Sequence, residues 1–215
     1  MVAIRHEGEL LRRLEMDLSD VQGKTSGERL AQLSPLQSSS LVIWLTGLPS
    51  SGKTTIANTL KPKLHRLGVK AEILDGDVTR RELSQDLGFT KEDMYKHAKK
   101  IIYLCKILSA NGIVSIVSAV SPDTEIRRFV SQQIGDNLME VYVRCSLATC
   151  IQRDCKGLYK KALDGQMRNL IGLQTPYEEP LDPDVIVDTE KENCDYITDK
   201  LILKLKELEK GDSCK

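Results

Sequence analysis

The sequence predicts a three-layer α/β domain with a five-stranded parallel sheet and a lid segment, and three observations support this prediction. Short apolar runs alternate with amphipathic stretches from residue 41 onward, which is typical of parallel strands joined by covering helices. A glycine-rich loop separates the first apolar run from the first amphipathic stretch. A polar segment with many Gly and Pro residues, at 154–183, interrupts the alternation near its end. At roughly 150 residues per domain, a chain of 215 residues suffices for one such domain and an appendage.

The appendage is predicted at the N-terminus, where the composition differs from the rest of the chain. Apolar residues recur at helical spacing among charges in residues 7–21, and residues 23–40 are rich in Ser, Gln and Gly. We therefore expect an N-terminal helical arm and linker at residues 1–40, followed by the main domain at residues 41–210. The arm is either a mobile segment or a helix that docks on a partner subunit.

Five strands and five main helices are predicted in alternation. Short apolar runs are typical of strands buried on both faces, and they predict strands at residues 41–46, 70–74, 113–120, 139–144 and 185–187. Apolar residues with the 3.6-residue period predict helices at residues 54–67, 91–111, 125–134, 146–153 and 195–209. Asn111 and Gly112 form a typical C-terminal cap for the second of these helices.

Composition limits the class of protein. Lys and Arg total 31 and Asp and Glu total 31, so the chain lacks the positive excess with which proteins hold nucleic acid by bulk charge. Its apolar stretches are far shorter than the ~20 residues that cross a bilayer, and residues 1–9 lack the apolar core of a secretory signal. The six cysteines form no Cys-x-x-Cys pair, so we interpret them as reduced core residues. We expect a cytoplasmic protein with no nucleic-acid or membrane partner.

A phosphate-binding pattern, G-x-x-x-x-G-K-[ST], is matched at every fixed position by Gly-Leu-Pro-Ser-Ser-Gly-Lys-Thr at residues 47–54. Gly47 and Gly52 permit the backbone conformations that turn consecutive N–H groups toward phosphate oxygens. Lys53 would reach the β- and γ-phosphates, and the Thr54 hydroxyl would ligate Mg²⁺. The predicted strand before the loop and helix after it argue against an accidental glycine-rich turn. We expect ATP and Mg²⁺ here, with the nucleotide held by Gly47, Leu48, Pro49, Ser50, Ser51, Gly52, Lys53, Thr54 and Thr55.

Two carboxylates, Asp75 and Asp77, follow the second predicted strand. Ligands of open parallel sheets bind beyond the carboxyl ends of the strands, so both side chains are expected near the phosphates. There an Asp would orient Mg²⁺ or accept the proton of an attacking hydroxyl, whereas an isolated Asp-Gly-Asp would be a solvated turn. Among the basic residues, Arg80, Arg153 and Lys156 stand after strand ends or in the polar segment. We interpret that segment as a lid that closes over ATP.

Ser121 and Pro122 directly follow the third predicted strand. Ser121 either begins the next helix as its N-cap, with Pro122 at the first helical position, or hydrogen-bonds a substrate anion. The cap is the simpler of the two interpretations. His97 lies between charged residues of a predicted helix, so solvation is the default expectation for it.

Several of these residues belong to longer motifs that occur together in one family. The motifs are the phosphate loop, residues 75–77, Arg80, residues 86–89 (Asp-Leu-Gly-Phe), Ser121-Pro122, residues 156–162 (Lys-Gly-Leu-Tyr-Lys-Lys-Ala) and residues 175–178 (Thr-Pro-Tyr-Glu). The last two are far more specific than a phosphate loop. Over about residues 41–205 the chain thus resembles the adenylylsulfate kinases, which phosphorylate adenosine 5′-phosphosulfate (APS) at its 3′-hydroxyl. The resemblance implies a P-loop kinase fold, MgATP as phosphate donor, a small nucleotide substrate and a homodimer.

The resemblance also implies roles for individual residues. Asp77 and Arg80 match substrate-binding residues, Phe89 matches a ring that stacks on the acceptor base, and Lys156 matches a substrate-binding lysine of the lid. Ser121 matches a serine described as a phosphorylated intermediate, although direct in-line transfer fits a phosphate-loop site more economically. The expected catalytic residues are Lys53, Asp75, Asp77 and Ser121, with Thr54 and Asp75 as metal ligands and Arg153 on the ATP side. The expected substrate-binding residues are Asp77, Arg80, Phe89, His97, Val120, Ser121, Lys156 and Leu170.

The chain departs from the family's pattern on the acceptor side. Met94 stands where the family has Arg, and His97 stands where it has Asn. Asp123 replaces an aromatic residue and would add negative charge near an anionic ligand, while Leu170 replaces a second stacking Phe. A lost stacking ring weakens binding of a base by about 1–3 kcal/mol.

Three functions are compatible with these residues. The first expectation is ATP-dependent phosphorylation of APS at its 3′-hydroxyl, giving its 3′-phosphorylated form (PAPS) and ADP. The altered pocket also suits another nucleotide, such as a cytidine diphosphate derivative (cytidine diphosphoramidate), whose smaller base needs less stacking and whose edge His97 would contact. A nucleotide-binding module without catalysis is the third, and the presence of Lys53, Thr54, Asp75 and Asp77 argues against it.

Overall fold

The structure, a computed structural model, describes residues 40–212. These residues lie in the larger of the two units into which the chain divides, Pro35–Lys215. The predicted arm and linker at residues 1–40 lie outside the described residues, apart from Ser40. Within the described part of the chain, no helix has the length and apolar character needed to cross a membrane.

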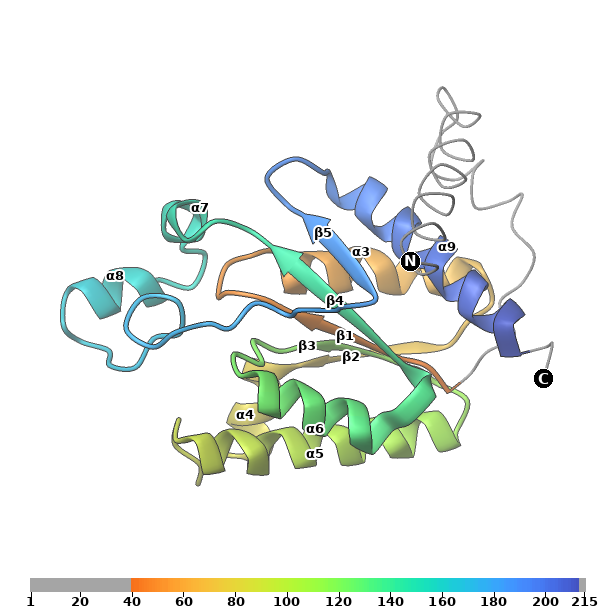
Figure 1. Ribbon diagram of the computed structural model, residues 1–215, viewed down its shortest axis with the longest axis horizontal. Helices are drawn as coiled ribbons and strands as arrows, with labels where there is room; N and C mark the ends of the chain where they lie inside the picture. The colour runs from red at the N-terminus through yellow and green to blue at the C-terminus, as the bar shows by residue number, and fades with distance from the viewer. Residues whose placement is uncertain (1–39, 213–215) are drawn as a thin grey trace, which may run out of the picture. The chain divides into compact units, whose positions relative to one another are not determined.

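A five-stranded parallel sheet forms the centre of this unit (Figure 1). Its strands are β1 (Val42–Thr46), β2 (Ala71–Asp75), β3 (Val114–Ser118), β4 (Leu138–Arg144) and β5 (Val185–Asp188). Their spatial order is β2-β3-β1-β4-β5, and every neighbouring pair is parallel. The central strand β1 is buried along its whole length, so the loop that follows it emerges at the middle of the sheet. The predicted fold class is confirmed.

Helices cover both faces of the sheet and give the three layers (Figure 1). On one face, α3 (Lys53–Arg66) packs against α9 (Cys194–Asp212). On the other face, α5 (Lys91–Ala110) packs against α6 (Thr124–Ile134). The helix α7 (Leu147–Arg153) follows β4 and leads toward the lid. The apolar periodicity of the sequence predicts all five helices to within a few residues.

The sequence pattern does not predict three short elements: α4 (Gly76–Leu83), α8 (Leu158–Leu163) and the 3₁₀ turn η1 (Gly135–Asn137). No apolar period marks α4, because its two large apolar residues, Val78 and Leu83, are both exposed. Asp75 starts α4 instead, since its Oδ1 accepts hydrogen bonds from the backbone N–H groups of Asp77 and Val78. The Asp-Gly-Asp sequence is therefore the beginning of a helix rather than a solvated turn.

The main core lies between the sheet and helices α5 and α6. Trp44 of β1 is only 2% exposed, and it belongs to a buried cluster with Ile101, Ile102, Val117 and Val130. The chain has few aromatic residues, and aliphatic side chains fill most of this core. The scarcity of aromatic residues correctly predicts an aliphatic core.

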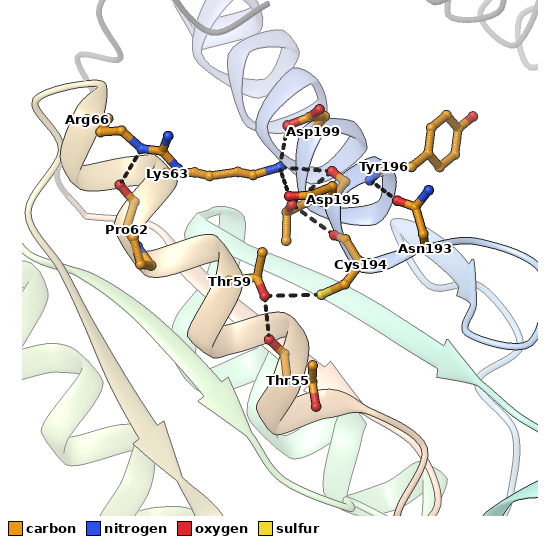
Figure 2. A network of polar contacts seen from close by, with 11 residues as sticks. Thr55, Thr59, Pro62, Lys63, Arg66, Asn193, Cys194, Asp195, Tyr196 and Asp199 are labelled. Atoms are coloured by element: carbon orange, nitrogen blue, oxygen red, sulfur yellow. Dashed lines mark hydrogen bonds and ion pairs between the residues drawn. The ribbon is translucent and has the colours of Figure 1, made fainter. Parts of the chain in front are cut away.

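On the opposite face, a buried ion pair joins α3 to α9 (Figure 2). Lys63 of α3 is 1% exposed, and its Nζ lies 2.7 Å from Asp199 Oδ1 and 3.0 Å from Asp195 Oδ1. The same Nζ donates a hydrogen bond to the Asp195 carbonyl at 3.0 Å. Nearby, the Cys194 thiol donates to Thr59 Oγ1 at 3.3 Å. Because α3 begins at the phosphate loop and α9 follows β5, the pair holds together two elements that reach the candidate site.

The predicted lid contains a small hydrophobic core of its own, although its sequence is mostly polar. Tyr159, Ala162 and Leu170 are buried together with Cys145 and Cys150. Leu170 therefore packs inside the lid, where its side chain is 7% exposed in total. This core explains why the segment holds a defined shape despite its Gly and Pro content.

Five of the six cysteines lie in the described residues, and all five are free thiols. Cys105, Cys145 and Cys150 are buried, as predicted for reduced core residues. Cys155 is exposed and Cys194 is half-buried, so these two are not core residues.

The prediction that Ser121 caps the next helix is wrong. Helix α6 begins at Thr124, and its N-cap is Asp123, whose Oδ1 accepts a hydrogen bond from the Glu125 N–H at 2.8 Å. The Asp123 carboxylate also lies 3.3 Å from Lys91 Nζ, so its charge is compensated. Ser121 instead is buried and adopts a left-handed backbone conformation, with φ of 44°.

Candidate active site

A cavity of about 540 Å³ lies at the carboxyl ends of the strands, where open α/β sheets bind their ligands. Its wall combines the loop after β1, the start of α4, part of α5, the segment after β3, the lid and the segment after β5. Most of the predicted site residues meet there: Pro49, Ser50, Gly52, Lys53, Thr54, Thr55, Asp75, Asp77, Arg80, Phe89, His97, Val120, Ser121, Arg153 and Lys156. We call the end at residues 49–55 the phosphate end, and the end at residues 77–97 the acceptor end.

The loop after β1 has the open backbone that phosphate binding requires. Gly47 and Gly52 have φ of 149° and 106°, and a Cβ on Gly47 would lie 2.5 Å from the Val143 carbonyl oxygen. Lys53 follows at the start of α3, and its Nζ donates to the carbonyls of Gly47 at 2.9 Å and Leu48 at 2.6 Å. Burial lowers the pKa of Lys53 to about 8. The negative charge of a bound phosphate would raise this pKa again and so stabilise the protonated amine.

Thr54 and Asp75 form a candidate magnesium site. Thr54 Oγ1 donates to Asp75 Oδ2 at 2.9 Å and lies 3.3 Å from Ser118 Oγ. Hydroxyl and carboxylate oxygens suit Mg²⁺, which proteins often hold with one or two such ligands and phosphate oxygens of the substrate. Among residues 40–212, no group of three or more His, Cys, Asp or Glu side chains is arranged to hold a metal ion. The two residues therefore fit a magnesium ion that the nucleotide helps to hold.

The acceptor end carries charged side chains and one exposed ring. Lys156 Nζ of the lid lies 2.6 Å from Asp77 Oδ2 of α4. Arg80, one turn further along α4, donates to the Gly88 carbonyl at 2.7 Å, and its guanidinium lies 4.7 Å from the centre of the Phe89 ring. Phe89 is 63% exposed, so a large part of its ring is available to a planar ligand. This arrangement suits a small ligand with an anionic group and an aromatic base.

His97 is buried, which corrects the expectation of a solvated residue. It is 8% exposed, its Nδ1 lies 3.0 Å from Ser84 Oγ, and it lines the acceptor end together with Met94. Burial and, to a smaller degree, the positive charge of Arg80 lower the pKa of His97 to about 4. The imidazole is therefore uncharged near neutral pH, and it offers the cavity a polar group without a charge.

The lid contacts the phosphate loop directly. The buried Tyr159 hydroxyl donates to the Pro49 carbonyl at 3.1 Å. Gly172, with φ of 90°, comes so close to Leu48 that a Cβ at this position would overlap the Leu48 side chain. The motif around Tyr159 thus positions the lid against the loop that would hold the ATP phosphates.

Arg153 joins the lid to the segment after β5. Its guanidinium donates to Thr189 Oγ1 at 2.9 Å and to the Thr189 carbonyl at 2.8 Å. Thr189 Oγ1 in turn donates to the Ser51 carbonyl at 2.9 Å. Arg153 therefore lies at the phosphate end, consistent with its expected place on the ATP side.

Four predicted site residues lie behind the wall of the cavity: Gly47, Leu48, Ser51 and Leu170. The first three support the phosphate loop through the backbone contacts described above. Leu170 packs in the core of the lid, and the adjacent Ile171 lines the cavity in its place. Asp123 is likewise absent from the wall, so the expected negative charge near the ligand is not found there.

Sequence reasoning missed several residues of the cavity wall. Ser118 ends β3 and Thr189 follows β5, so the rule that ligands bind at strand ends offered a signal for both. Trp44, the only Trp of the chain, also lines the cavity, and its Nε1 donates to Ser121 Oγ at 2.9 Å. No sequence pattern pairs two residues that lie 77 positions apart.

A phosphate loop between a central strand and a helix, with a lid and paired carboxylates around one cavity, defines the class of P-loop kinases. Comparison with known proteins then identifies the family. The adenylylsulphate kinase family model matches residues 39–188, which is more than half of the chain. The chain belongs to the adenylylsulfate kinase family.

Curated relatives and solved structures agree with this assignment. A probable adenylyl-sulfate kinase of Archaeoglobus fulgidus is 47% identical over 152 residues, which cover 71% of this chain and 97% of the relative. The adenylyl-sulfate kinase of Gloeothece citriformis is 44% identical over 168 residues, covering 78% of this chain and 95% of the relative. The structure of the Mycobacterium tuberculosis APS kinase CysC in complex with AMPPNP and APS matches with a TM-score of 0.74 at 33% identity, covering 78% and 98% of the two chains.

Proposed function

We propose that this protein transfers the γ-phosphate of ATP to the 3′-hydroxyl of adenosine 5′-phosphosulfate, giving PAPS and ADP. The observation that carries the proposal is that one cavity joins a complete phosphate loop to the acceptor-end side chains Asp77, Arg80 and Lys156. The similarity to relatives named adenylyl-sulfate kinase, and to a structure solved with AMPPNP and APS, supports APS as the acceptor.

At the phosphate end, the backbone N–H groups of the loop and of the first turn of α3 bind the ATP phosphates. Lys53 exchanges its contacts with the loop carbonyls for contacts with phosphate oxygens. Thr54 and Asp75 would hold Mg²⁺, which would supply positive charge beside the phosphate oxygens. Arg153 covers the nucleotide from the lid side, where Thr189 fixes its guanidinium.

At the acceptor end, Asp77 is the carboxylate that orients the attacking 3′-hydroxyl. Asp75 is less available for this role, since Oδ1 caps α4 and Oδ2 accepts from Thr54. Lys156 and Arg80 bind the phosphosulfate group, and Phe89 stacks on the base. Ser121 Oγ accepts a hydrogen bond from the Trp44 indole, so Ser121 serves as a wall residue and direct in-line transfer needs no phosphoserine.

The experiment is ADP release measured against a panel of acceptor nucleotides with ATP and Mg²⁺. Turnover with APS, and its loss in Lys53→Met, is the expected result. A cytidine diphosphate derivative is the second candidate acceptor, because the uncharged His97 and the apolar Met94 line the acceptor end. Turnover with cytidine diphosphoramidate and none with APS would replace the first acceptor by the second. ATP binding without transfer to any acceptor would indicate a non-catalytic nucleotide-binding module.

We further propose that the enzyme is a homodimer, as the family resemblance implies. We also propose that it is cytoplasmic and has no nucleic-acid or membrane partner, as its charge and composition favour. Light scattering of the full chain tests the oligomeric state. A mass of two chains supports the homodimer, and a mass of one chain, or of more than two, contradicts it.

A further inference from the structure

Residues 120–122, which we call the Ser121 turn, form part of the cavity wall. The turn is strained, because Ser121 has a φ of 44° although it is not a glycine. Such a conformation persists only where the surrounding structure fixes it. The phosphoryl-transfer roles described above do not account for the groups that fix this turn.

Every carbonyl of the Ser121 turn accepts a hydrogen bond from a different segment of the chain. The donors to the three carbonyls, in order along the turn, are Thr46 Oγ1 at 2.7 Å, Arg127 Nη1 at 2.8 Å and the Glu178 backbone N–H at 2.9 Å. The first carbonyl also accepts a longer hydrogen bond, 3.4 Å, from the Gly47 backbone N–H. The Ser121 hydroxyl is held as well, by the Trp44 indole. The backbone of the turn is thus specified by contacts from β1, α6 and the end of the lid.

Tyr177 completes this set of contacts. Its hydroxyl lies 3.0 Å from Thr46 Oγ1, and the single proton of Thr46 is already directed to the turn, so Tyr177 is the donor of this pair. Burial raises the pKa of Tyr177 to about 12, so the hydroxyl keeps its proton in the physiological range. Tyr177 belongs to the Thr-Pro-Tyr-Glu motif, which has no role in the chemistry proposed at the phosphate end.

Arg127 holds the other side of the turn. It is a 6% exposed arginine of α6, and besides the turn it contacts Thr124 Oγ1 at 3.1 Å and Glu140 Oε1 at 3.4 Å. Its guanidinium lies 5.9 Å from the centre of the Tyr177 ring. Neither Arg127 nor Tyr177 lines the cavity. Both therefore act on a ligand only through the Ser121 turn.

We propose that Arg127 and Tyr177 are positioning residues, which hold the Ser121 turn in its strained conformation and thereby shape the acceptor end of the site. Tyr177 and Glu178 lie near the end of the lid segment. The contacts that fix the turn therefore also connect it to the lid. This inference rests on the proposed function for its substrate, and it deepens that function by adding residues that determine how the acceptor is held.

The kinetic test compares the half-buried Tyr177 and the buried Arg127 with exposed residues of the same types. Tyr177→Phe removes one oxygen and keeps the ring, and we expect it to raise the KM for APS about tenfold while the KM for ATP changes less than about twofold. Arg127→Met is expected to have a larger effect in the same direction, which Arg127→Lys partly restores. Tyr103→Phe and Arg128→Met are the matched controls, because both residues are exposed. An equal rise in both KM values, or no change in either, would overturn the proposal.

A spectroscopic measurement tests the same inference without any acceptor. Trp44 is the only Trp of the chain, so tryptophan emission comes from the one indole that donates to Ser121. Tyr177→Phe is expected to shift the Trp44 emission maximum and to increase quenching by acrylamide, whereas Tyr103→Phe leaves both unchanged. Identical spectra for Tyr177→Phe and the wild type would contradict the positioning role, even if Arg127→Met fails to fold.

The two measurements also separate this inference from the proposed function. If the wild type phosphorylates no APS but Tyr177→Phe alters Trp44 fluorescence, the choice of acceptor is wrong, and the role of Tyr177 in positioning the Ser121 turn is supported. If the wild type phosphorylates APS and Tyr177→Phe alters neither the KM for APS nor the fluorescence, the positioning role is wrong and the proposed function stands.

Discussion

The two ends of the cavity are built in different ways. At the phosphate end, one local motif supplies the cation and its contacts: Lys53 donates to carbonyls five and six residues before it. Distant segments support this loop from outside, since Tyr159 and Thr189 donate to its carbonyls. At the acceptor end, the charged groups themselves come from distant segments, because Asp77 contacts Lys156, 79 residues away. The cation of the phosphate end thus belongs to a local motif, while the acceptor end depends on how separate elements pack.

This difference bears on Met94 and His97, the residues at which the resemblance implies a departure from the family's pattern. Both line the acceptor end, and the pattern of the phosphate loop is matched in full. An acceptor end assembled from separate side chains tolerates a change in one of them without loss of the others. We therefore expect substitutions at the phosphate end to abolish transfer, and substitutions at the acceptor end to change which nucleotide is preferred.

The largest effect is expected from Lys53→Met, which removes the cation of the phosphate end. Loss of a buried group that stabilises transition-state charge lowers kcat by roughly a hundredfold to a thousandfold. ADP release in the presence of APS measures it, and Lys61→Met, on the exposed side of the same helix, is the control. A kcat within about threefold of the wild type would contradict the assignment of Lys53.

The next largest effect concerns the buried ion pair between α3 and α9 (Figure 2). Lys63→Met removes the cation that contacts the carboxylates of Asp199 and Asp195, and we expect it to lower the free energy of unfolding by about 3–5 kcal/mol. Lys61→Met breaks the exposed pair with Glu72 and should cost at most about 1 kcal/mol. Urea denaturation of both variants gives the comparison. Equal losses of unfolding free energy in the two variants would show that burial of the Lys63 pair does not determine its contribution to stability.

These two ends also differ in how far the sequence predicts them. The phosphate loop, the strand that precedes it and the burial of that strand follow from local patterns, namely glycine spacing and apolar runs. The sequence does not decide whether Asp123 or Ser121 caps α6, because Asp and Ser are both good N-caps; the structure shows that Asp123 does. The hydrogen bond from Trp44 to Ser121 and the burial of Leu170 in the lid depend on tertiary packing, which no local pattern encodes.

A smaller effect on the free energy of unfolding is expected from protonation of His97 as the pH falls. Its pKa is about 4 in the folded protein, against 6.5 for an unperturbed histidine, so between these pH values the unfolded chain binds a proton that the folded protein does not. Stability is therefore complete above about pH 6.5 and falls as the pH drops toward about 4, by up to about 3 kcal/mol. His97→Gln should lose less stability over this interval.

Urea midpoints measured at both ends of that pH interval test the sign. His65→Gln is the matched control, because His65 is an exposed histidine of α3. If His97→Gln and the wild type lose the same free energy of unfolding between the two pH values, the uncharged buried imidazole is not the cause.

The smallest effect concerns specificity at the acceptor end. Met94→Arg places a cation on the wall of the cavity, and a charge-assisted contact to an anionic acceptor should lower the KM for APS about tenfold. Leu170→Phe should leave this KM unchanged, because Leu170 lies in the core of the lid, and overpacking there should cost about 1–3 kcal/mol of stability. A lower KM for APS in Leu170→Phe would place that side chain in the site after all.

The central claim is that one cavity transfers a phosphoryl group from ATP to a ribose 3′-oxygen. It is tested most directly by incubating the full chain with ATP, Mg²⁺ and APS, identifying the product by mass spectrometry, and repeating the reaction with 3′-deoxy-APS. We predict a product heavier than APS by one phosphoryl group, formed together with an equal amount of ADP, and no such product from the 3′-deoxy analogue. Phosphorylation of the 3′-deoxy analogue, or ADP release without a phosphorylated acceptor, would contradict the claim.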